Sequence, residues 1–374
     1  MIYLDNAATT YEKPEAVKRA MINAYEECTS VGRGGYESAS RAAEKVYTAR
    51  ERAAELFGAA SPEQVVFTSN ATHALNIAIK GYADKGNCVI SSYEHNSVLR
   101  PIKADKNLEC RIARGSLFDP EMMIESFRRL IDKDTRFVVC THMSNVFGYI
   151  LPVKEIDELC AERGIPLIID ASQSAGSIDV KLDDFSACKC ICAPGHKGLY
   201  GPQGTGLLIC RSGEEIKTFM EGGTGSDSAK WEQPDFMPDR LECGTHNVPG
   251  ISGLSEGIAY ILRRKTDEII KKERALTDMI SRELKKIDSL YVFSSKDESL
   301  QGGVVSFLSD RMSAEKIADQ LAAEKIAVRS GLHCSPLAHR TVGTHTGTVR
   351  VSVSDFTQEK EVVYFIKKLR RILS

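Results

Sequence analysis

Residues 166–174 read Pro-Leu-Ile-Ile-Asp-Ala-Ser-Gln-Ser, a short apolar run that ends at Asp170. A second apolar run, at 190–198, reads Cys-Ile-Cys-Ala-Pro-Gly-His-Lys-Gly and ends near Lys197. Short apolar runs bounded by turn-forming residues are typical of buried strands. The sequence therefore predicts an acid at the tip of one strand and an amine at the tip of another.

These two side chains are the pair that pyridoxal 5'-phosphate (PLP) chemistry requires. The Lys197 amine can form a Schiff base, and the Asp170 carboxylate can keep the pyridine nitrogen protonated so that the ring accepts electrons. Either residue alone would more often be a solvated lysine or a helix-capping aspartate. Because each follows a buried-looking strand, we favour the cofactor interpretation.

The composition restricts the classes of protein. The chain has 374 residues, enough for two domains, and a net charge of −2, which does not favour nucleic acid as a partner. We expect no membrane association, because no apolar stretch approaches the roughly 20 residues of a membrane helix and the N-terminus lacks a signal peptide. The eleven cysteines are an odd number in scattered positions, which predicts reduced thiols in a cytoplasmic protein.

Apolar runs and helical patterns alternate through the first part of the chain. We expect strands at 64–68, 88–91, 137–140, 166–170, 187–192 and 205–210, and helices at 38–57, 71–82 and 153–163. This alternation predicts an α/β fold with a mainly parallel sheet and helices on both faces. Ligands in such sheets bind beyond the carboxyl ends of the strands. Five residues at or after strand ends can therefore converge on one site: Thr68, His95, Asn145, Asp170 and Lys197.

The rest of the chain has a different character. Residues 221–245 are rich in glycine and predict a long functional loop, and a helical stretch with a break covers 247–286. Strands at 304–307, 326–329 and 349–353, with helices at 313–324 and 357–372, predict a small α+β domain. We expect three parts: an N-terminal segment (1–14) packing with the small domain, a large PLP-binding domain (15–250) and a small C-terminal domain (251–374).

A candidate phosphate site lies where a predicted strand turns into a helix. Residues 68–74 read Thr-Ser-Asn-Ala-Thr-His-Ala, and N–H groups and hydroxyls at a helix start can bind an anion. An ordinary helix cap is the commoner meaning of such residues, but Lys197 favours phosphate. His95 also follows a predicted strand, where it could stack on a cofactor ring or cap a helix.

The cysteines and histidines offer little support for a metal site. Three cysteines alternate along one predicted strand, so we expect them on the same face as core residues: Cys188, Cys190 and Cys192. A looser group of potential ligands has irregular spacing, which argues against zinc: His333, Cys334, His339 and His345. We therefore expect no metal.

Two residues near the C-terminus suggest chemistry on a substrate. Cys334 lies in a loop that follows a predicted strand, with Arg and His neighbours. This setting favours a nucleophilic thiol over an unreactive cysteine. Arg350 lies between apolar residues of a predicted strand. Arginine is rarely buried without an anion, so Arg350 predicts a bound substrate carboxylate or a structural ion pair.

Nearly the whole chain resembles the class V aminotransferases of PLP fold type I, and among them the cysteine desulfurases. The matching segments are 3–10, Thr68 with 71–72, 94–95, Asn145 with Gly148, 170–174, 195–197, 244–245, 329–334 and 347–350. The Arg-Ser-Gly-Leu-His-Cys segment at 329–334 resembles group II desulfurases and selenocysteine lyases. Gly32-Arg33-Gly34-Gly35 also looks like group II.

The resemblance implies a seven-stranded-type sheet and a set of roles. Lys197 would carry the cofactor and move protons, Asp170 would pair with the pyridine nitrogen, and Gln173 would meet the phenolic oxygen. His95 would stack on the ring. The remaining cofactor contacts would come from Ala71, Thr72, Asn145 and His196, with Thr245 contributed across a homodimer. Asn145, Arg329 and Arg350 would bind the substrate, and Cys334 would attack its sulfur.

The resemblance implies a homodimeric cysteine desulfurase that converts L-cysteine to L-alanine, leaves the sulfur as a persulfide on Cys334, and passes it to a possible acceptor protein. The alternatives are a selenocysteine lyase, another class V aminotransferase or cysteine lyase, and a PLP-binding regulatory protein without turnover. Two positions depart from the family pattern. Pro194 replaces a usual Ser or Thr near the phosphate, and Tyr36 stands where relatives often carry His.

Overall fold

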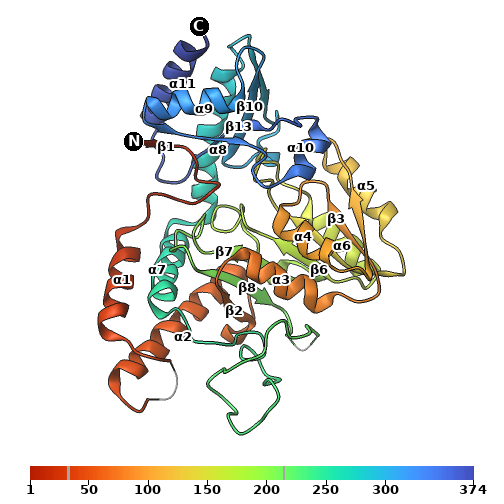
Figure 1. Ribbon diagram of the computed structural model, residues 1–374, viewed down its shortest axis with the longest axis vertical. Coiled ribbons are helices and arrows are strands. Elements are labelled where there is room, and N and C mark those ends of the chain that lie inside the picture. Colours follow the sequence, from red (N-terminus) through yellow and green to blue (C-terminus); the bar gives the residue numbers. More distant parts are fainter. Residues whose placement is uncertain (32–33, 214) are drawn as a thin grey trace.

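The computed structural model describes residues 1–31, 34–213 and 215–374. A seven-stranded sheet of order β2-β8-β7-β6-β5-β3-β4 forms the centre of the larger unit (Figure 1). Its strands are β2 (Val65–Thr68), β3 (Gly86–Ser91), β4 (Leu108–Ala113), β5 (Thr135–Thr141), β6 (Leu167–Asp170), β7 (Cys188–Pro194) and β8 (Gly206–Cys210). Only β8 runs antiparallel to its neighbours, which confirms the predicted mainly parallel sheet.

Helices cover both faces of this sheet, as predicted. One face packs against α3 (Ala71–Tyr82) and α4 (Asn96–Ala104). The other packs against α2 (Glu37–Phe57), α5 (Pro120–Leu130), α6 (Val153–Glu162) and α7 (Val248–Arg264), with α1 (Glu15–Glu27) alongside. Neighbouring strand residues alternate between the two cores: Val138 and Cys140 face one, and Phe137 and Val139 face the other.

The smaller unit is built on a four-stranded antiparallel sheet of order β12-β13-β10-β9. Its strands are β9 (Leu290–Phe293), β10 (Val304–Ser309), β12 (Arg329–Gly331) and β13 (Thr348–Ser352). Its helices are α8 (Thr266–Leu284), α9 (Ala314–Ala323), α10 (Pro336–Val342) and α11 (Glu359–Leu373). The predicted strand at 326–329 is divided: β11 (Ile326–Ala327) pairs with the N-terminal β1 (Ile2–Tyr3), and β12 begins at Arg329.

The N-terminal segment joins the smaller unit, where both chain ends lie (Figure 1). Leu4 belongs to the buried cluster beneath α8, α9 and α11. The predicted division at 14 and 250 stays a proposal. α7 continues past 250 and packs along α1 and α2, and a break at Lys265 separates it from α8.

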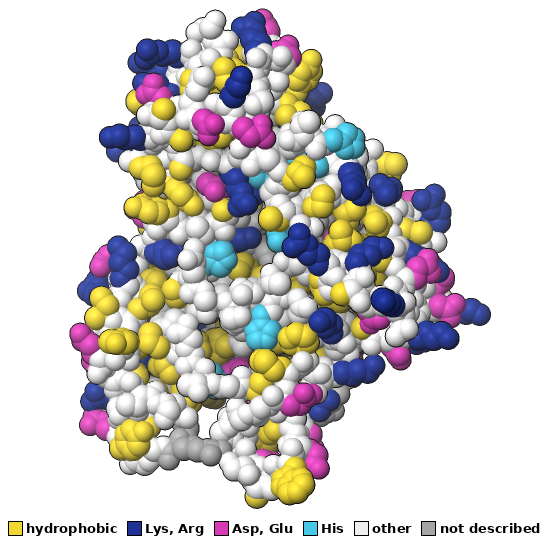
Figure 2. Space-filling view, viewed as in Figure 1, with side chains coloured by type: hydrophobic (Ala, Val, Ile, Leu, Met, Phe, Trp, Pro, Cys, Tyr) yellow, Lys and Arg dark blue, Asp and Glu magenta, His cyan; other side chains and the backbone are white. Residues whose placement is uncertain are grey.

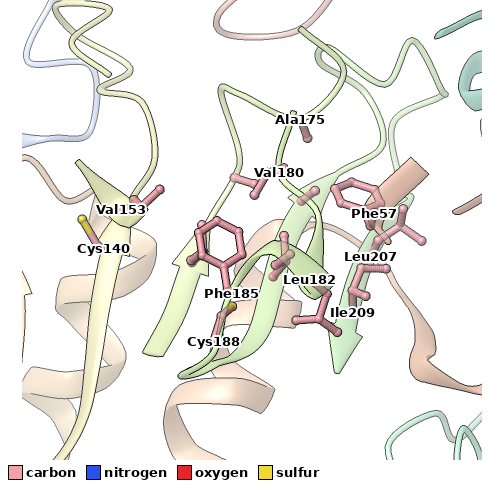
Figure 3. Close-up of a cluster of buried hydrophobic side chains, with 14 of the residues drawn as sticks. Phe57, Cys140, Val153, Ala175, Val180, Leu182, Phe185, Cys188, Leu207 and Ile209 are labelled. Atoms are coloured by element: carbon pink, nitrogen blue, oxygen red, sulfur yellow. The ribbon is translucent and has the colours of Figure 1, made fainter. Parts of the chain in front are cut away.

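The predicted common face of the three strand cysteines is wrong. Cys188 packs with Leu182 and Phe185 on one face of the sheet (Figure 3), whereas Cys190 and Cys192 belong to the core on the other face. The register of β7 against β6 shifts between Cys188 and Cys190, and this irregularity turns Cys188 over.

The predicted long loop is present, and its functional role stays a prediction. Residues 221–245 form neither helix nor strand, and they enter α7 through the cap residue Asn247. Among the helices in the described part of the chain, none is both long enough and apolar enough to cross a bilayer.

Candidate active site

A cavity of about 220 Å³ lies at the carboxyl ends of the central strands, between the two units. Eleven of the twelve residues predicted for the site line it: Ala71, Thr72, His95, Asn145, Asp170, Gln173, His196, Lys197, Arg329, Cys334 and Arg350. They come from five separate loops, from the start of α3, from the end of β6 and from β12 and β13, so the fold brings together residues that are far apart in the sequence.

Lys197 and Asp170 face this cavity from adjacent strand ends. Asp170 ends β6 and is 2% exposed, and its Oδ1 accepts a hydrogen bond of 2.9 Å from the Ser172 backbone N–H. Lys197 follows β7. Burial lowers the pKa of the Lys197 amine to about 8, although Asp170 acts in the opposite direction. A much larger fraction of this amine than of an ordinary lysine is therefore uncharged near neutral pH, and an uncharged amine is the nucleophilic form.

His95 caps a helix and lines the cavity at the same time. Its Nδ1 accepts a hydrogen bond of 3.1 Å from the Ser97 backbone N–H at the start of α4. Burial, with Lys197 nearby, lowers the pKa of the imidazole to about 4. His95 is therefore a neutral ring at neutral pH. The capping contact fixes its orientation, so the two interpretations of His95 from the sequence are compatible.

The start of α3 supplies open hydrogen-bond donors. Asn70 caps this helix by accepting from the His73 N–H, and the N–H groups of Ala71 and Thr72 have no acceptor within the described residues. The Thr72 hydroxyl lies 2.8 Å from that of Ser97. His196 is also placed here, with its Nδ1 3.0 Å from Thr9 Oγ1. This end of the cavity suits a phosphate.

Arg350 is a buried cation with an incomplete set of partners. It lies on β13, is 1% exposed, and pairs with Asp5 through an Nη2–Oδ1 distance of 2.7 Å. Its Nη1 donates to the Asn145 carbonyl oxygen at 2.9 Å, while its Nε has no partner within the described part of the chain.

Arg329 stands directly opposite Arg350, because the two residues are paired across β12 and β13. Like charges in this arrangement are unfavourable. Burial and the nearby Arg329 charge lower the pKa of Arg350, while Asp5 raises it. The structural ion pair considered from the sequence is thus present, and the two arginines still leave donors available for an anion.

Cys334 occupies a constrained loop between β12 and α10. His333 and Cys334 have φ angles of +49° and +59°, which non-glycine residues rarely adopt. Asn145 holds this loop from both sides: its Nδ2 donates to the His333 carbonyl at 2.7 Å, and its Oδ1 accepts from the Ser335 hydroxyl at 2.6 Å. All eleven cysteines are free, and Cys334 alone among them is exposed.

The model of the class V aminotransferases matches residues 2–365. The chain belongs to this family.

Similar proteins from this family extend over the whole chain. A probable cysteine desulfurase of Methanothermobacter thermautotrophicus is 32% identical, over 99% of this chain and 94% of that protein. A probable cysteine desulfurase of Pyrococcus abyssi is 31% identical, over 100% of this chain and 94% of that one. Other relatives are longer: the chain spans 60% of the cysteine desulfurase of Synechococcus elongatus. The structure of the apo cysteine desulfurase of Thermococcus onnurineus superposes with a TM-score of 0.92 at 28% identity, covering 99% of this chain and 94% of that one.

Thr245 is the twelfth residue predicted for the site of this class V aminotransferase, and it does not line the cavity. Thr245 is exposed and lines a separate open cavity of about 1180 Å³ between the long loop and α2. A buried network fixes its position: Glu242 accepts from Arg50 Nη1 at 3.0 Å and from the Phe67 N–H at 2.7 Å, and also contacts His246. Thr245 thus lies outside the cavity that the other eleven residues line.

Several residues of the site were not predicted from the sequence. Ser97 links Thr72 to His95, and Asp5 pairs with Arg350. Glu94 is fully buried under the site, where its Oε1 accepts from the Thr141 N–H at 2.7 Å. Burial, with Asp170 nearby, raises the pKa of Glu94 to about 8, so it is neutral at pH 7. Ser97 follows His95 by two residues, a spacing that could have indicated a capping contact, but nothing local identifies the partners of Asp5 or Glu94.

The remaining sequence candidates lie outside the cavity. Tyr36 precedes α2 and is 52% exposed. Gly32 and Arg33 fall outside the described residues. Within the described residues, no group of three His, Cys, Asp or Glu side chains is arranged to hold a metal ion.

The donor set of the cavity fits PLP. Lys197 Nζ has no hydrogen-bond acceptor within the described residues, so this amine is free for covalent attachment. The open N–H groups of α3 and the buried Asp170 lie on other walls of the same cavity and suit a phosphate and a pyridine nitrogen. Gln173 lines it too, with its Nε2 donating to the Ala7 carbonyl at 2.9 Å.

Proposed function

We propose that the chain is a PLP-dependent cysteine desulfurase, which converts L-cysteine to L-alanine and keeps the sulfur as a persulfide on Cys334. One observation carries the proposal: the one exposed thiol of the protein lines the same cavity as Lys197, Asp170 and Arg350. A transaminase or a lyase has no need of such a thiol. The names of the relatives support the same activity.

PLP, when bound, supplies an electron sink for negative charge that develops at the substrate Cα. Lys197 would hold it covalently and then take and return the Cα proton, a task for which a pKa of about 8 is well matched. Asp170 would hold the ring nitrogen, Gln173 the phenolic oxygen, and His95 one face of the ring. Ala71, Thr72 and His196 would bind the phosphate.

Ser97 would also serve the phosphate. We propose that its hydroxyl takes the place of the hydroxyl that the family usually supplies at position 194. Pro194 ends β7 and has no donor of its own, whereas Ser97 lies 2.8 Å from Thr72 at the start of α3. A hydroxyl at this point can donate to an anion held by the helix N-terminus.

The substrate carboxylate would bind between Arg350 and Arg329. An anion there relieves the repulsion between the two guanidinium groups and gives Arg350 Nε an acceptor. Asn145 would then serve mainly through the Cys334 loop, because both ends of its amide already bond to that loop.

Cys334 would attack the substrate sulfur as a thiolate. A bond forms between the Cys334 sulfur and the substrate Sγ, the Cβ–Sγ bond breaks, and its electron pair stays with the carbon fragment, which takes up a proton. The sum is L-cysteine plus a Cys334 thiol giving L-alanine plus a Cys334 persulfide. Atoms and charge balance without an external oxidant.

We also propose a cytoplasmic homodimer. Thr245 is exposed and does not line the Lys197 cavity of its own chain, which supports a role at the phosphate of a second copy. The free state of all eleven thiols supports a reducing compartment. A possible acceptor protein would receive the sulfur.

Purified protein reconstituted with PLP tests the activity. With L-cysteine and a reductant, we expect equal amounts of L-alanine and sulfide. Cys334→Ala should lose most of both, whereas Cys243→Ala, which removes a half-buried thiol of the long loop, should not. Pyruvate and ammonia in place of alanine would indicate a lyase, and a marked preference for selenocysteine that survives Cys334→Ala would indicate a selenocysteine lyase.

A further inference from the structure

Positive charge gathers on the surface beside Cys334. Residues 95–114 contain five Lys or Arg and two Asp or Glu, in a chain whose net charge is −2. Figure 2 shows several Lys and Arg side chains over the region where Figure 1 places α4, with few carboxylates among them. The local excess is therefore a property of this face rather than of the whole molecule.

Arg100 and Lys103 from this stretch, and Arg340 of α10, have no carboxylate partner in the described structure. Arg100 and Lys103 on α4 and Arg340 on α10 are exposed, and none of the three forms an ion pair or side-chain hydrogen bond within the described residues. We call these three residues the α4 basic face. Unpaired surface cations of this kind attract an acidic partner through a field that salt screens.

The α4 basic face is attached to the Cys334 loop. The Asn96 N–H at the start of α4 donates to the Cys334 carbonyl oxygen at 2.9 Å, and Arg100 follows one helical turn later. Leu337 of α10 belongs to the same buried cluster as Val98 and Ile102 of α4. A molecule that reaches Cys334 from solvent therefore passes beside this face.

We propose that the α4 basic face docks a sulfur-acceptor protein whose reactive cysteine is surrounded by acidic residues. The proposal rests on the proposed function, since it concerns a persulfide on Cys334. The partner's thiolate attacks the outer sulfur of the persulfide, the bond between the two sulfurs breaks, and the Cys334 thiolate leaves. The partner then carries the transferred sulfur as a persulfide, and neither oxidant nor reductant is needed.

A protein fits this face better than a nucleic acid does. The chain as a whole is slightly negative, which does not favour a polyanion as the partner. The transfer step also requires a nucleophilic thiolate, which an acidic protein loop can present directly.

Model acceptor peptides test whether the α4 basic face prefers acidic partners, without knowledge of the natural partner. Holoenzyme carrying the persulfide would be mixed with one of three peptides of equal length, each with a single cysteine flanked by glutamate, lysine or serine. Sulfur transfer is followed by mass spectrometry at low and at high ionic strength. Dithiothreitol, which is uncharged, reports the intrinsic reactivity of the persulfide.

We expect the glutamate peptide to react roughly tenfold faster than the serine peptide at low salt, and the rates to converge at high salt. Arg100→Glu with Lys103→Glu should reverse the order in favour of the lysine peptide and leave the dithiothreitol rate unchanged. The matched control is Lys360→Glu with Lys367→Glu on α11, two exposed lysines without ion pairs in the described structure, and it should behave as wild type. The Arg100→Glu, Lys103→Glu variant is not used for this comparison if it also reacts slowly with dithiothreitol. In that case the Arg100→Gln, Lys103→Gln variant replaces it, and this variant should show no preference for the glutamate peptide.

Equal rates for the glutamate and lysine peptides in the wild type would overturn the inference. A short RNA that blocks the face, with no preference among the peptides, would assign it to nucleic acid instead. If no persulfide forms, the proposed function fails, but the preference of the α4 basic face for acidic peptides can still be measured. The Cys334 thiol would then be titrated with the same peptides as activated disulfides, and the glutamate peptide should again react fastest.

Discussion

Arg350 and Asp5 form an ion pair on the wall of the cavity, with Nη2 and Oδ1 2.7 Å apart. The pair joins β13 to the N-terminal segment, residues that are 345 positions apart. Because the guanidinium is buried and its Nε has no partner in the described structure, a substrate carboxylate would share Arg350 with Asp5. Asp5 would therefore reduce the affinity of the site for substrate.

Replacing Asp5 by Asn should lower the KM for L-cysteine several-fold, because the competing negative charge is removed. Arg350→Gln should raise KM by roughly 10–100-fold, since a hydrogen bond to a charged group contributes about 1.5–3 kcal/mol. Steady-state kinetics on both holoenzymes measure the difference. A rise in KM for Asp5→Asn as large as that for Arg350→Gln would place Asp5 among the groups that hold the substrate.

Asp170→Asn should lose rate far more than it loses cofactor. A neutral amide cannot keep the pyridine nitrogen protonated, and the loss of about 2–3 kcal/mol corresponds to roughly 30–150-fold in kcat. Absorbance of bound PLP and turnover are measured on the same sample. Turnover near the wild-type value with full cofactor occupancy would remove Asp170 from this role.

Ser97→Ala should weaken PLP binding roughly 5–15-fold, the effect of one neutral hydrogen bond of about 1–1.5 kcal/mol. Equilibrium titration of the apoprotein with PLP gives the Kd directly. Adding Pro194→Ser to Ser97→Ala should recover much of the affinity, because it restores the hydroxyl that the family usually carries. No change in Kd for Ser97→Ala would show that Pro194 has no such substitute.

Glu273 should make the protein less stable as the pH rises from about 6.5 to 8. This α8 residue is buried, and burial, with Asp355 nearby, raises its pKa to about 8 from an ordinary 4.5. The folded state therefore holds a proton that the unfolded state has released, and stability falls as pH rises through this window. Glu94 acts in the same direction, whereas the histidines with lowered pKa values act below 6.5.

Denaturant unfolding of the apoprotein at pH 6.5 and 8 measures this effect. The slope per group is at most about 1.4 kcal/mol per pH unit. Glu273→Gln should make the stability flatter with pH, and Glu256→Gln, a change at a half-exposed residue of α7, serves as the control. A wild type whose stability rises over this interval would contradict the assignment.

The sequence predicted the parts of the fold that bury apolar runs. β5, β6 and β7 are covered on both faces and contain continuous apolar residues, so their ends could be located and Asp170 and Lys197 placed there. The edge strands β4 and β9 were missed because charged or exposed residues such as Glu109, Arg111 and Tyr291 interrupt them.

The site was predictable where a residue type and a strand end coincide. Its long-range contacts were not, because nothing near Asp5 indicates Arg350, and nothing near Asn145 indicates the Cys334 loop. The orientation of Cys188 depends on a register shift that alternation alone does not reveal.

The central claim is that Cys334 receives the sulfur. Holoenzyme would be treated with L-cysteine without reductant, digested and analysed by mass spectrometry. We predict one additional sulfur on the Cys334 peptide and none on the peptide containing Cys188, Cys190 and Cys192, whose thiols are buried. L-alanine formed together with an unmodified Cys334 peptide, or a Cys334→Ala enzyme that desulfurates cysteine at the full rate, would contradict the account.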